Sequence, residues 1–185
     1  MLLVSLLKIK TIKIGWCHST FEGYYRTRGR SCYGLLRSCK KSLSSLDYFI
    51  VLTKKDQKVF EREFNRKTYC LYNPVGMVST KITASPEKPI VFCGRLDKKT
   101  KGLDFLINII EIIHSKASKR EFVIIGDGPD AEWLKKRISE KNLDKCVRLV
   151  GKTDRVQNDY ENGSVLIHTS RWEGFGVVLV EAMSF

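Results

Sequence analysis

Residues 171–185, RWEGFGVVLVEAMSF, decide the fold of this chain. They follow an apolar run at 164–168, which predicts a buried strand, and they lead through a second apolar run into a predicted helix. Between the two, Glu173 and Glu181 flank the sequence Gly174-Phe175-Gly176. Glycines let backbone approach a ligand closely, and the first N–H groups of a helix attract anions. The stretch therefore predicts a phosphate site with two carboxylates for sugar hydroxyls, or else a plain corner with solvated glutamates.

The same order of strand, turn and helix recurs upstream. Residues 89–93, 121–125 and 146–150 predict three strands, while 103–116, 129–141 and 154–162 predict helices, with Pro129 as the first helical residue. Such alternation is typical of a parallel sheet covered by helices. The helix at 103–116 is expected to be largely buried, because apolar residues form a wide face: Leu103, Phe105, Leu106, Ile109, Ile110, Ile112 and Ile113.

A basic loop follows the strand at 89–93. Gly94-Arg95-Leu96 comes first, and residues 97–102 (DKKTKG) are predicted as loop up to the next helix. Arg95 at the strand end and Lys101 at the helix start can both hold a diphosphate, the former with its planar fork and the latter as a point charge. Lys99 is the alternative to Lys101, and a solvated basic loop is the alternative to a site.

These motifs together resemble family-4 retaining glycosyltransferases, whose GT-B fold has two Rossmann-like domains. The resemblance rests on Gly-Arg-Leu, Lys-Gly, Gly-Asp-Gly-Pro and Glu-x7-Glu in this order. It implies that Arg95 and Lys101 neutralise the diphosphate of a nucleotide sugar, assisted by the backbone amides of Gly174, Phe175 and Gly176. It also implies that Glu181 binds the ribose and Glu173 the sugar hydroxyls. Because protein cations would replace it, no metal is expected, and neither is a cofactor.

The first half predicts a second α/β domain. Strands are expected at 8–17, 47–52 and 68–72, with a basic helix at 33–44 and a helix from Thr53 to Asn65 that Asp56 helps to cap. His18 lies just past the first strand, and the resemblance implies that it faces the donor sugar. The predicted domains are 1–72 on the acceptor side, a linker at 73–88 rich in proline and serine, and 89–185 for the nucleotide sugar.

Charge is concentrated in the first half. Residues 1–88 hold 17 Lys+Arg against 6 Asp+Glu, whereas residues 89–185 hold 16 against 14. A basic surface suits an anionic membrane or a nucleic acid. Residues 21–30 mix aromatics with arginines and are expected to form a loop, which could stack bases, rest at lipid headgroups or carry no partner. The six cysteines show no metal-site spacing and are expected to be reduced.

We therefore expect a cytoplasmic protein, peripheral at the inner face of the membrane. Its predicted activity is the transfer of a sugar from a nucleotide sugar to a glycan or lipid-linked acceptor, with retention of configuration. A sugar-nucleotide epimerase of the same fold and a basic nucleic-acid-binding protein are the alternatives; the latter does not explain the ordered motifs. Both domains look incomplete for a GT-B enzyme, so the chain is expected to be a fragment that is inactive alone.

Overall fold

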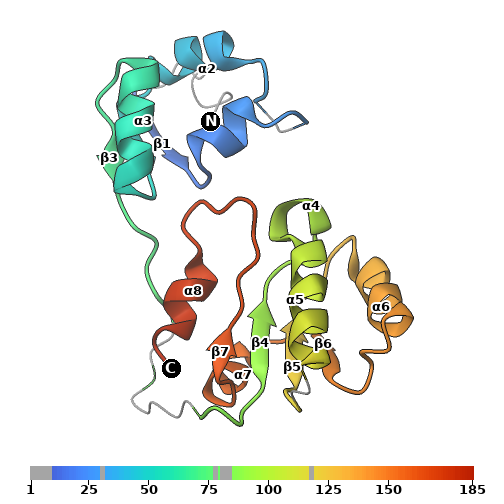
Figure 1. Cartoon of the computed structure of the whole chain (residues 1–185). Coiled ribbons are helices and arrows are strands. Elements are labelled where there is room, and N and C mark those ends of the chain that lie inside the picture. Colours follow the sequence, from blue (N-terminus) through green and yellow to red (C-terminus); the bar gives the residue numbers. More distant parts are fainter. Residues whose placement is uncertain (1–9, 30–31, 77–78, 80–84, 117–118) are drawn as a thin grey trace. The chain divides into compact units, whose positions relative to one another are not determined.

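The computed structural model describes residues 10–29, 32–76, 79, 85–116 and 119–185 (Figure 1). The chain forms two compact units. The first comprises Met1–Pro74 with Trp172–Phe175, and the second comprises Val75–Arg171 with Gly176–Phe185. Part of the predicted linker, residues 77–78 and 80–84, lies outside the described residues. Both units contain a parallel sheet, which confirms the predicted α/β fold class.

The first unit has a three-stranded sheet in the order β1-β2-β3. Its strands are β1 (Ile14–Cys17), β2 (Tyr48–Val51) and β3 (Tyr69–Cys70), all parallel. Parallel neighbours need crossover connections, which here are helical: η1 (Glu22–Arg26) and α2 (Leu36–Leu43) after β1, and α3 (Lys54–Phe64) after β2. The first strand begins at Ile14, later than predicted; residues 8–9 of that prediction lie outside the described residues.

The predicted cap of α3 is confirmed. The Thr53 side chain accepts a hydrogen bond from the Asp56 backbone N–H (3.0 Å), and the Thr53 hydroxyl donates to the Asp56 carboxylate (2.6 Å). This exchange satisfies one of the unpaired N–H groups of the first turn. At the other end Asn65 adopts a left-handed conformation with φ 49° and ends the helix.

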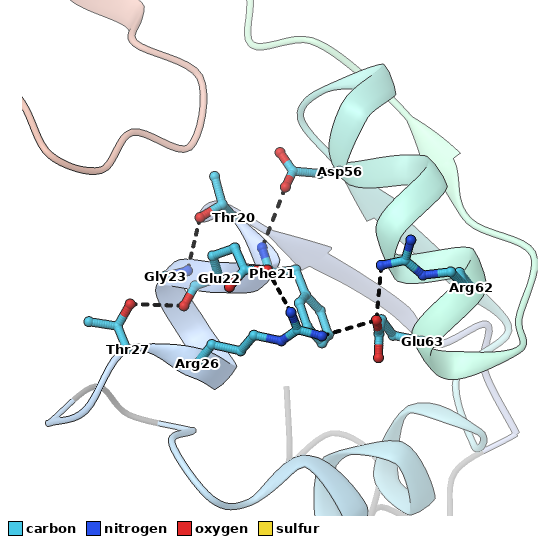
Figure 2. Close-up of polar contacts among 9 residues, drawn as sticks. All are labelled: Thr20, Phe21, Glu22, Gly23, Arg26, Thr27, Asp56, Arg62 and Glu63. Atoms are coloured by element: carbon cyan, nitrogen blue, oxygen red, sulfur yellow. Dashed lines mark hydrogen bonds and ion pairs between the residues drawn. The ribbon is translucent and has the colours of Figure 1, made fainter.

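Residues 21–30 were expected to form a loop, but Glu22–Arg26 form the π-helical turn η1; Arg30 lies outside the described residues. The turn is stabilised because Phe21 and Tyr25 pack on Phe60 in the core. Polar contacts shown in Figure 2 hold the same turn. The Phe21 N–H donates to Asp56 at 3.4 Å, and the Arg26 guanidinium pairs with both Glu22 and Glu63.

The second unit has a four-stranded parallel sheet in the order β6-β5-β4-β7 (Figure 1). Its strands are β4 (Ile90–Cys93), β5 (Phe122–Ile125), β6 (Val147–Gly151) and β7 (Val165–Leu166). The chain runs outward from β4 through β5 to β6 and then crosses back, so that β7 pairs with the opposite side of β4. The order of strands therefore reverses between β4 and β7.

Helices cover both faces of this sheet, as parallel sheets require. On one face, α5 (Leu103–Ser115) and α6 (Ala131–Glu140) pack on side chains such as Ile90, Phe92 and Ile124. On the other face, α7 (Val156–Glu161) and α8 (Val177–Ala182) contribute to a cluster around Val91 and Val123. The remaining helix, α4 (Lys98–Lys101), is a single turn directly before α5.

Four predictions for this unit are wrong in detail. Residues 98–101 were expected as loop but form α4, because the Asp97 carboxylate accepts a hydrogen bond from Thr100 N–H at 3.0 Å. The helix expected from Pro129 begins at Ala131, after Asp130, whose N–H is bonded to the carbonyl of Leu96. On α5, Phe105 and Ile112 are 49% and 55% exposed rather than buried.

The fourth concerns residues 164–168, which were expected to form a buried strand. The strand is only Val165–Leu166, and Val165 is 54% exposed. It pairs on one side, with β4, at the end of the described strand order. A strand flanked on both sides would bury such residues, and an apolar run alone does not distinguish the two cases.

Candidate functional site

The reversal of strand order between β4 and β7 marks where a ligand would bind. In open parallel sheets, ligands bind outside the carboxyl ends of the strands at such a switch point. The loop that follows β4 carries Arg95, and α4 beyond it carries Lys101. The loop that follows β7 leads through Arg171 to α8, which carries Glu181. The segments that carry the predicted site residues of the second unit thus follow the two strands that flank the switch point.

Two strand-end loops of this unit pack directly against each other. Gly126, at the end of β5, has φ 133°, and a Cβ there would overlap the carbonyl oxygen of Gly94. Likewise, a Cβ on Gly128 would overlap the backbone of Leu96. The Leu96 N–H also donates to the Asp127 carbonyl at 2.9 Å. The Gly-Asp-Gly-Pro turn therefore supports the backbone of the Gly-Arg-Leu loop.

Arg95 is an exposed residue two positions beyond β4. Its charge acts on Asp97, the residue that caps α4. Burial tends to raise the pKa of Asp97, but hydrogen bonds from Thr100 and the charge of Arg95 outweigh it, so that this pKa lies below its ordinary value. Asp97 is therefore ionised at neutral pH and holds the start of the turn that carries Lys101.

The charges of Lys101 and Glu181 both affect Cys93, at the carboxyl end of β4. A Cβ on Gly94 would lie 3.7 Å from Lys101 Cε, so the lysine side chain runs alongside Gly94. Burial raises the pKa of the Cys93 thiol; Glu181 adds to this effect and Lys101 opposes it. The geometry therefore places the Lys101 side chain at this strand end, where the charge of Glu181 also affects the Cys93 thiol, whereas Lys99 is exposed on α4.

The side chain of Lys98, the first residue of α4, packs against α6. Lys98 Nζ lies 4.6 Å from the centroid of the Trp133 ring on α6, in a cation–π contact. Its backbone N–H donates to the Asp130 carboxylate at 2.7 Å. Lys98 thus ties α4 to the start of α6, and its ammonium is not directed to the end of β4.

The remaining predicted residues, except Gly176, lie in the first unit. His18 follows β1, with its ring 5.0 Å from that of Trp16. A Cβ on Gly174 would overlap the carbonyl oxygen of His18, so the chain approaches closely there. Glu173 and Phe175 belong to the same short segment. In the second unit, Gly176 has φ 75° and stands at the N-cap of α8.

Sequence reasoning missed the contacts of Arg171 and Thr169. The Arg171 guanidinium forms two hydrogen bonds to Asp104, and the Thr169 hydroxyl donates to the Lys101 carbonyl at 2.8 Å. Arg171 and Asp104 are 67 residues apart in the chain, so no local pattern pairs them. The one available signal was the position of Arg171, two residues before Glu173.

Among the described residues, none of the helices combines the length and apolar character needed to cross a bilayer. Within the same residues, no cluster of three or more His, Cys, Asp and Glu side chains is arranged to hold a metal ion.

Comparisons with known proteins agree on one family. Residues 87–185 match the family described as glycosyl transferases group 1. An uncharacterized glycosyltransferase of Haemophilus influenzae is 24% identical over 98% of this chain and 50% of its own length. The phosphatidylinositol N-acetylglucosaminyltransferase gpi3 subunit of Schizosaccharomyces pombe is 31% identical over 78% of this chain and 34% of its own length. The chain thus spans half or less of these relatives.

Solved structures show the same fold. A variant of S. aureus TarM, crystallised with Fondaparinux, alpha-GlcNAc-glycerol and UDP, superposes with a TM-score of 0.78 at 24% identity. The match covers 94% of this chain and 35% of that one. Since the family match spans more than half of the sequence, the chain belongs to the glycosyl transferases group 1 family and has the Rossmann-like α/β fold of GT-B glycosyltransferases.

Proposed function

We propose that the protein transfers a sugar from a nucleotide-sugar donor to a glycan or lipid-linked acceptor, with retention of anomeric configuration. The observation that carries the proposal is the arrangement at the end of β4. There the Lys101 side chain runs alongside Gly94, the next residue is Arg95, and the charge of Glu181 acts on the same strand end. Cations beside a carboxylate at a switch point suit a nucleoside diphosphate.

The two cations would act on the leaving group. As the bond to the sugar breaks, negative charge develops on the departing diphosphate, and fixed positive groups there lower the barrier. Arg95 would contribute a planar fork and Lys101 a compact charge. The backbone amides of Gly174, Phe175 and Gly176 would assist them. We propose that these groups make a metal ion unnecessary.

The carboxylates and the histidine would orient the donor. Glu181 would accept hydrogen bonds from the ribose hydroxyls, and Glu173 from hydroxyls of the transferred sugar next to the reacting carbon. His18 would also contact the transferred sugar. Holding the sugar in one orientation turns the reaction with the acceptor into an effectively intramolecular step, which accounts for a large part of many enzymatic accelerations.

The relatives suggest which donor to test first. The S. pombe relative is named as an N-acetylglucosaminyltransferase, and the S. aureus structure contains UDP and an N-acetylglucosamine glycoside. We therefore propose UDP-N-acetylglucosamine as the first donor to test. For the acceptor, the proposal extends to glycans and lipid-linked sugars without choosing between them.

The basic first half would hold the enzyme at the cytoplasmic face of a membrane. The helix α2 exposes Arg37, Lys40 and Lys41, while Cys39 and Leu43 are buried against the unit. Tyr33 and Leu35, just before it, are exposed as well. Basic side chains beside exposed apolar ones suit a surface of anionic lipid. Nucleic acid is not part of the proposal.

The experiment is a transfer assay of the full-length gene product with a panel of nucleotide sugars in the presence of EDTA. Products are identified by mass spectrometry, and the anomeric configuration of the new bond by proton NMR. We expect transfer that survives EDTA and retains configuration. An epimerised donor without transfer would instead indicate the epimerase, and tight oligonucleotide binding without turnover a nucleic-acid-binding protein. As a control, Lys135→Ala changes an exposed lysine on α6 and should leave transfer intact.

A further inference from the structure

The junction between α4 and α5 packs against the loop that follows β7. Gly102 adopts φ 61° at this junction, and a Cβ there would overlap the carbonyl oxygen of Thr169. The Thr169 hydroxyl donates a hydrogen bond to the Lys101 carbonyl at 2.8 Å. The Lys101 N–H in turn donates to the Asp97 carbonyl at 2.8 Å. The backbone of Lys101 is therefore held on both sides.

Arg171 completes the cap of α4. The last carbonyls of a helix have no partner within it and need donors from elsewhere. The Arg171 backbone N–H donates to the Thr100 carbonyl at 2.8 Å, and its Nη1 donates to the Lys98 carbonyl at 3.0 Å. One residue thus donates to two carbonyls of the single turn that carries Lys101: it is a partner for the Thr100 carbonyl and a second donor to the Lys98 carbonyl, which also accepts from the Gly102 N–H at 3.1 Å.

The same guanidinium is also fixed to the start of α5. It forms two hydrogen bonds to the Asp104 carboxylate, at 2.9 and 2.6 Å. It also lies over the Phe105 ring, 4.2 Å from the centroid. A bidentate pair combined with a stacked ring is a geometry that only arginine can form. Arg171 therefore links the end of α4 to the first turn of α5.

We infer that Arg171 is a positioning residue for Lys101, and that through this junction it sets how the Lys101 side chain runs beside Gly94. The inference rests on the proposed function, because it assigns Lys101 to the donor diphosphate. Arg171 itself makes no contact with the donor in this account. Its guanidinium is occupied by Asp104, Phe105 and the Lys98 carbonyl, so its effect on the donor passes through the backbone of α4.

The first test needs no nucleotide. Lysine amines are acetylated under limiting reagent, and labelling of Lys101 is measured by mass spectrometry relative to exposed Lys145. In Arg171→Ala the turn should open more often, so labelling of Lys101 should rise roughly threefold or more. The control is Arg137→Ala, because Arg137 also pairs with a carboxylate (Glu140, 2.8 Å) and lies near an aromatic ring (Trp133, 5.9 Å) on α6. Unchanged labelling of Lys101 in Arg171→Ala would overturn the inference.

The second test is a double-mutant cycle on UDP affinity, measured by calorimetry. Arg171→Ala should weaken UDP binding about tenfold, equivalent to about 1.4 kcal/mol. In a Lys101→Ala background the same change should have almost no further effect, because residues that act through one group are not additive. A purely structural role would instead give additive losses, which would contradict the inference. Arg171→Lys, which keeps the charge but loses the fork, repeats the cycle if Arg171→Ala does not fold.

The two tests separate the inference from the proposed function. If the wild-type protein does not bind UDP but Lys101 labelling still responds to Arg171, the donor assignment fails and the positioning role stands. If UDP binding depends on Lys101 but neither measurement responds to Arg171, the positioning role fails and the proposed function stands.

Discussion

Gly126 approaches Gly94 so closely that a Cβ on Gly126 would overlap the Gly94 carbonyl oxygen. The relationship joins the loops that follow two neighbouring strands, β4 and β5. It leaves the backbone before Arg95 with little room to move, while the Lys101 side chain lies along the same glycine. The proposed phosphate site therefore depends on a contact between two glycines that carry no functional group.

Gly126→Ala tests this dependence. A positive φ costs a residue with a Cβ about 1–3 kcal/mol, and overlap with Gly94 adds to it. The free energy of unfolding should fall and UDP affinity should fall with it, as followed by denaturant unfolding and calorimetry. Gly151→Ala is the control, because Gly151 has φ 77° and a Cβ added to it would meet no atom within 4 Å. Equal losses in the two variants would show that the contact with Gly94 has no cost of its own.

Substitutions of Glu173 and Glu181 are expected to change different quantities. If Glu181 binds ribose, Glu181→Gln should weaken the binding of free UDP. If Glu173 binds only the transferred sugar, Glu173→Gln should leave UDP affinity unchanged and lower the turnover of the nucleotide sugar. Calorimetry with UDP and a transfer assay measure the two quantities. The reverse pattern would exchange the two assignments.

The Arg171–Asp104 ion pair predicts that the free energy of unfolding depends on pH. The hydrogen bond from Arg171 is the main cause that lowers the pKa of Asp104 below its ordinary value of 3.8. A carboxylate with a lowered folded-state pKa contributes stability above its unfolded pKa, and the contribution is lost as pH falls through the folded-state value. Asp104→Asn should therefore lower the free energy of unfolding at pH 7.

Below pH 3.8, the ordinary pKa of Asp104, the difference in unfolding free energy between Asp104→Asn and wild type should shrink. Denaturant unfolding at a series of pH values measures the profile. A difference of constant size from neutral to acid pH would mean that the ionised pair does not stabilise the protein. Because both side chains are partly exposed, the effect should also decline as salt is added.

Membrane binding should depend on α2. Replacing Arg37, Lys40 and Lys41 together by Glu should weaken binding to vesicles of anionic lipid, measured by co-sedimentation. The matched control replaces Lys54, Lys55 and Lys58 on α3, which are exposed in the same unit. Exposed charges are screened over about 8 Å at physiological salt, so wild-type binding should weaken as salt rises. Equal binding to neutral and anionic vesicles would contradict the electrostatic account.

Features that depend on neighbours in the sequence could be predicted from it. The helix from Thr53 to Asn65 was located correctly, because Thr53 and Asp56 make the cap within one turn. The strands around β4 and β5 were located to within a residue or two, because their apolar runs are bounded by glycine or charge. Arg95, Lys101 and Glu181 were selected from motifs that are local in the same sense.

Features that depend on the assembled sheet could not be predicted. The exposure of Val165 follows from its strand lying at the end of the strand order, which no local pattern reports. The π-helical turn at Glu22–Arg26 forms because Phe21 and Tyr25 reach an aromatic core built by α3. Arg171 and Asp104 lie far apart in the sequence, and they meet in the fold in which β7 pairs with β4.

The central claim is that the end of β4 binds the diphosphate of a nucleotide sugar, and Arg95→Ala tests it most directly. Each hydrogen bond to a charged group is worth about 1.5–3 kcal/mol, and Arg95 is exposed, so that its removal should leave the fold intact. Calorimetric titration with UDP compares wild type, Arg95→Ala and the control Arg148→Ala, which removes an exposed arginine from β6. The account predicts a loss of about tenfold or more in Arg95→Ala alone. Equal UDP affinity in all three folded proteins would contradict it.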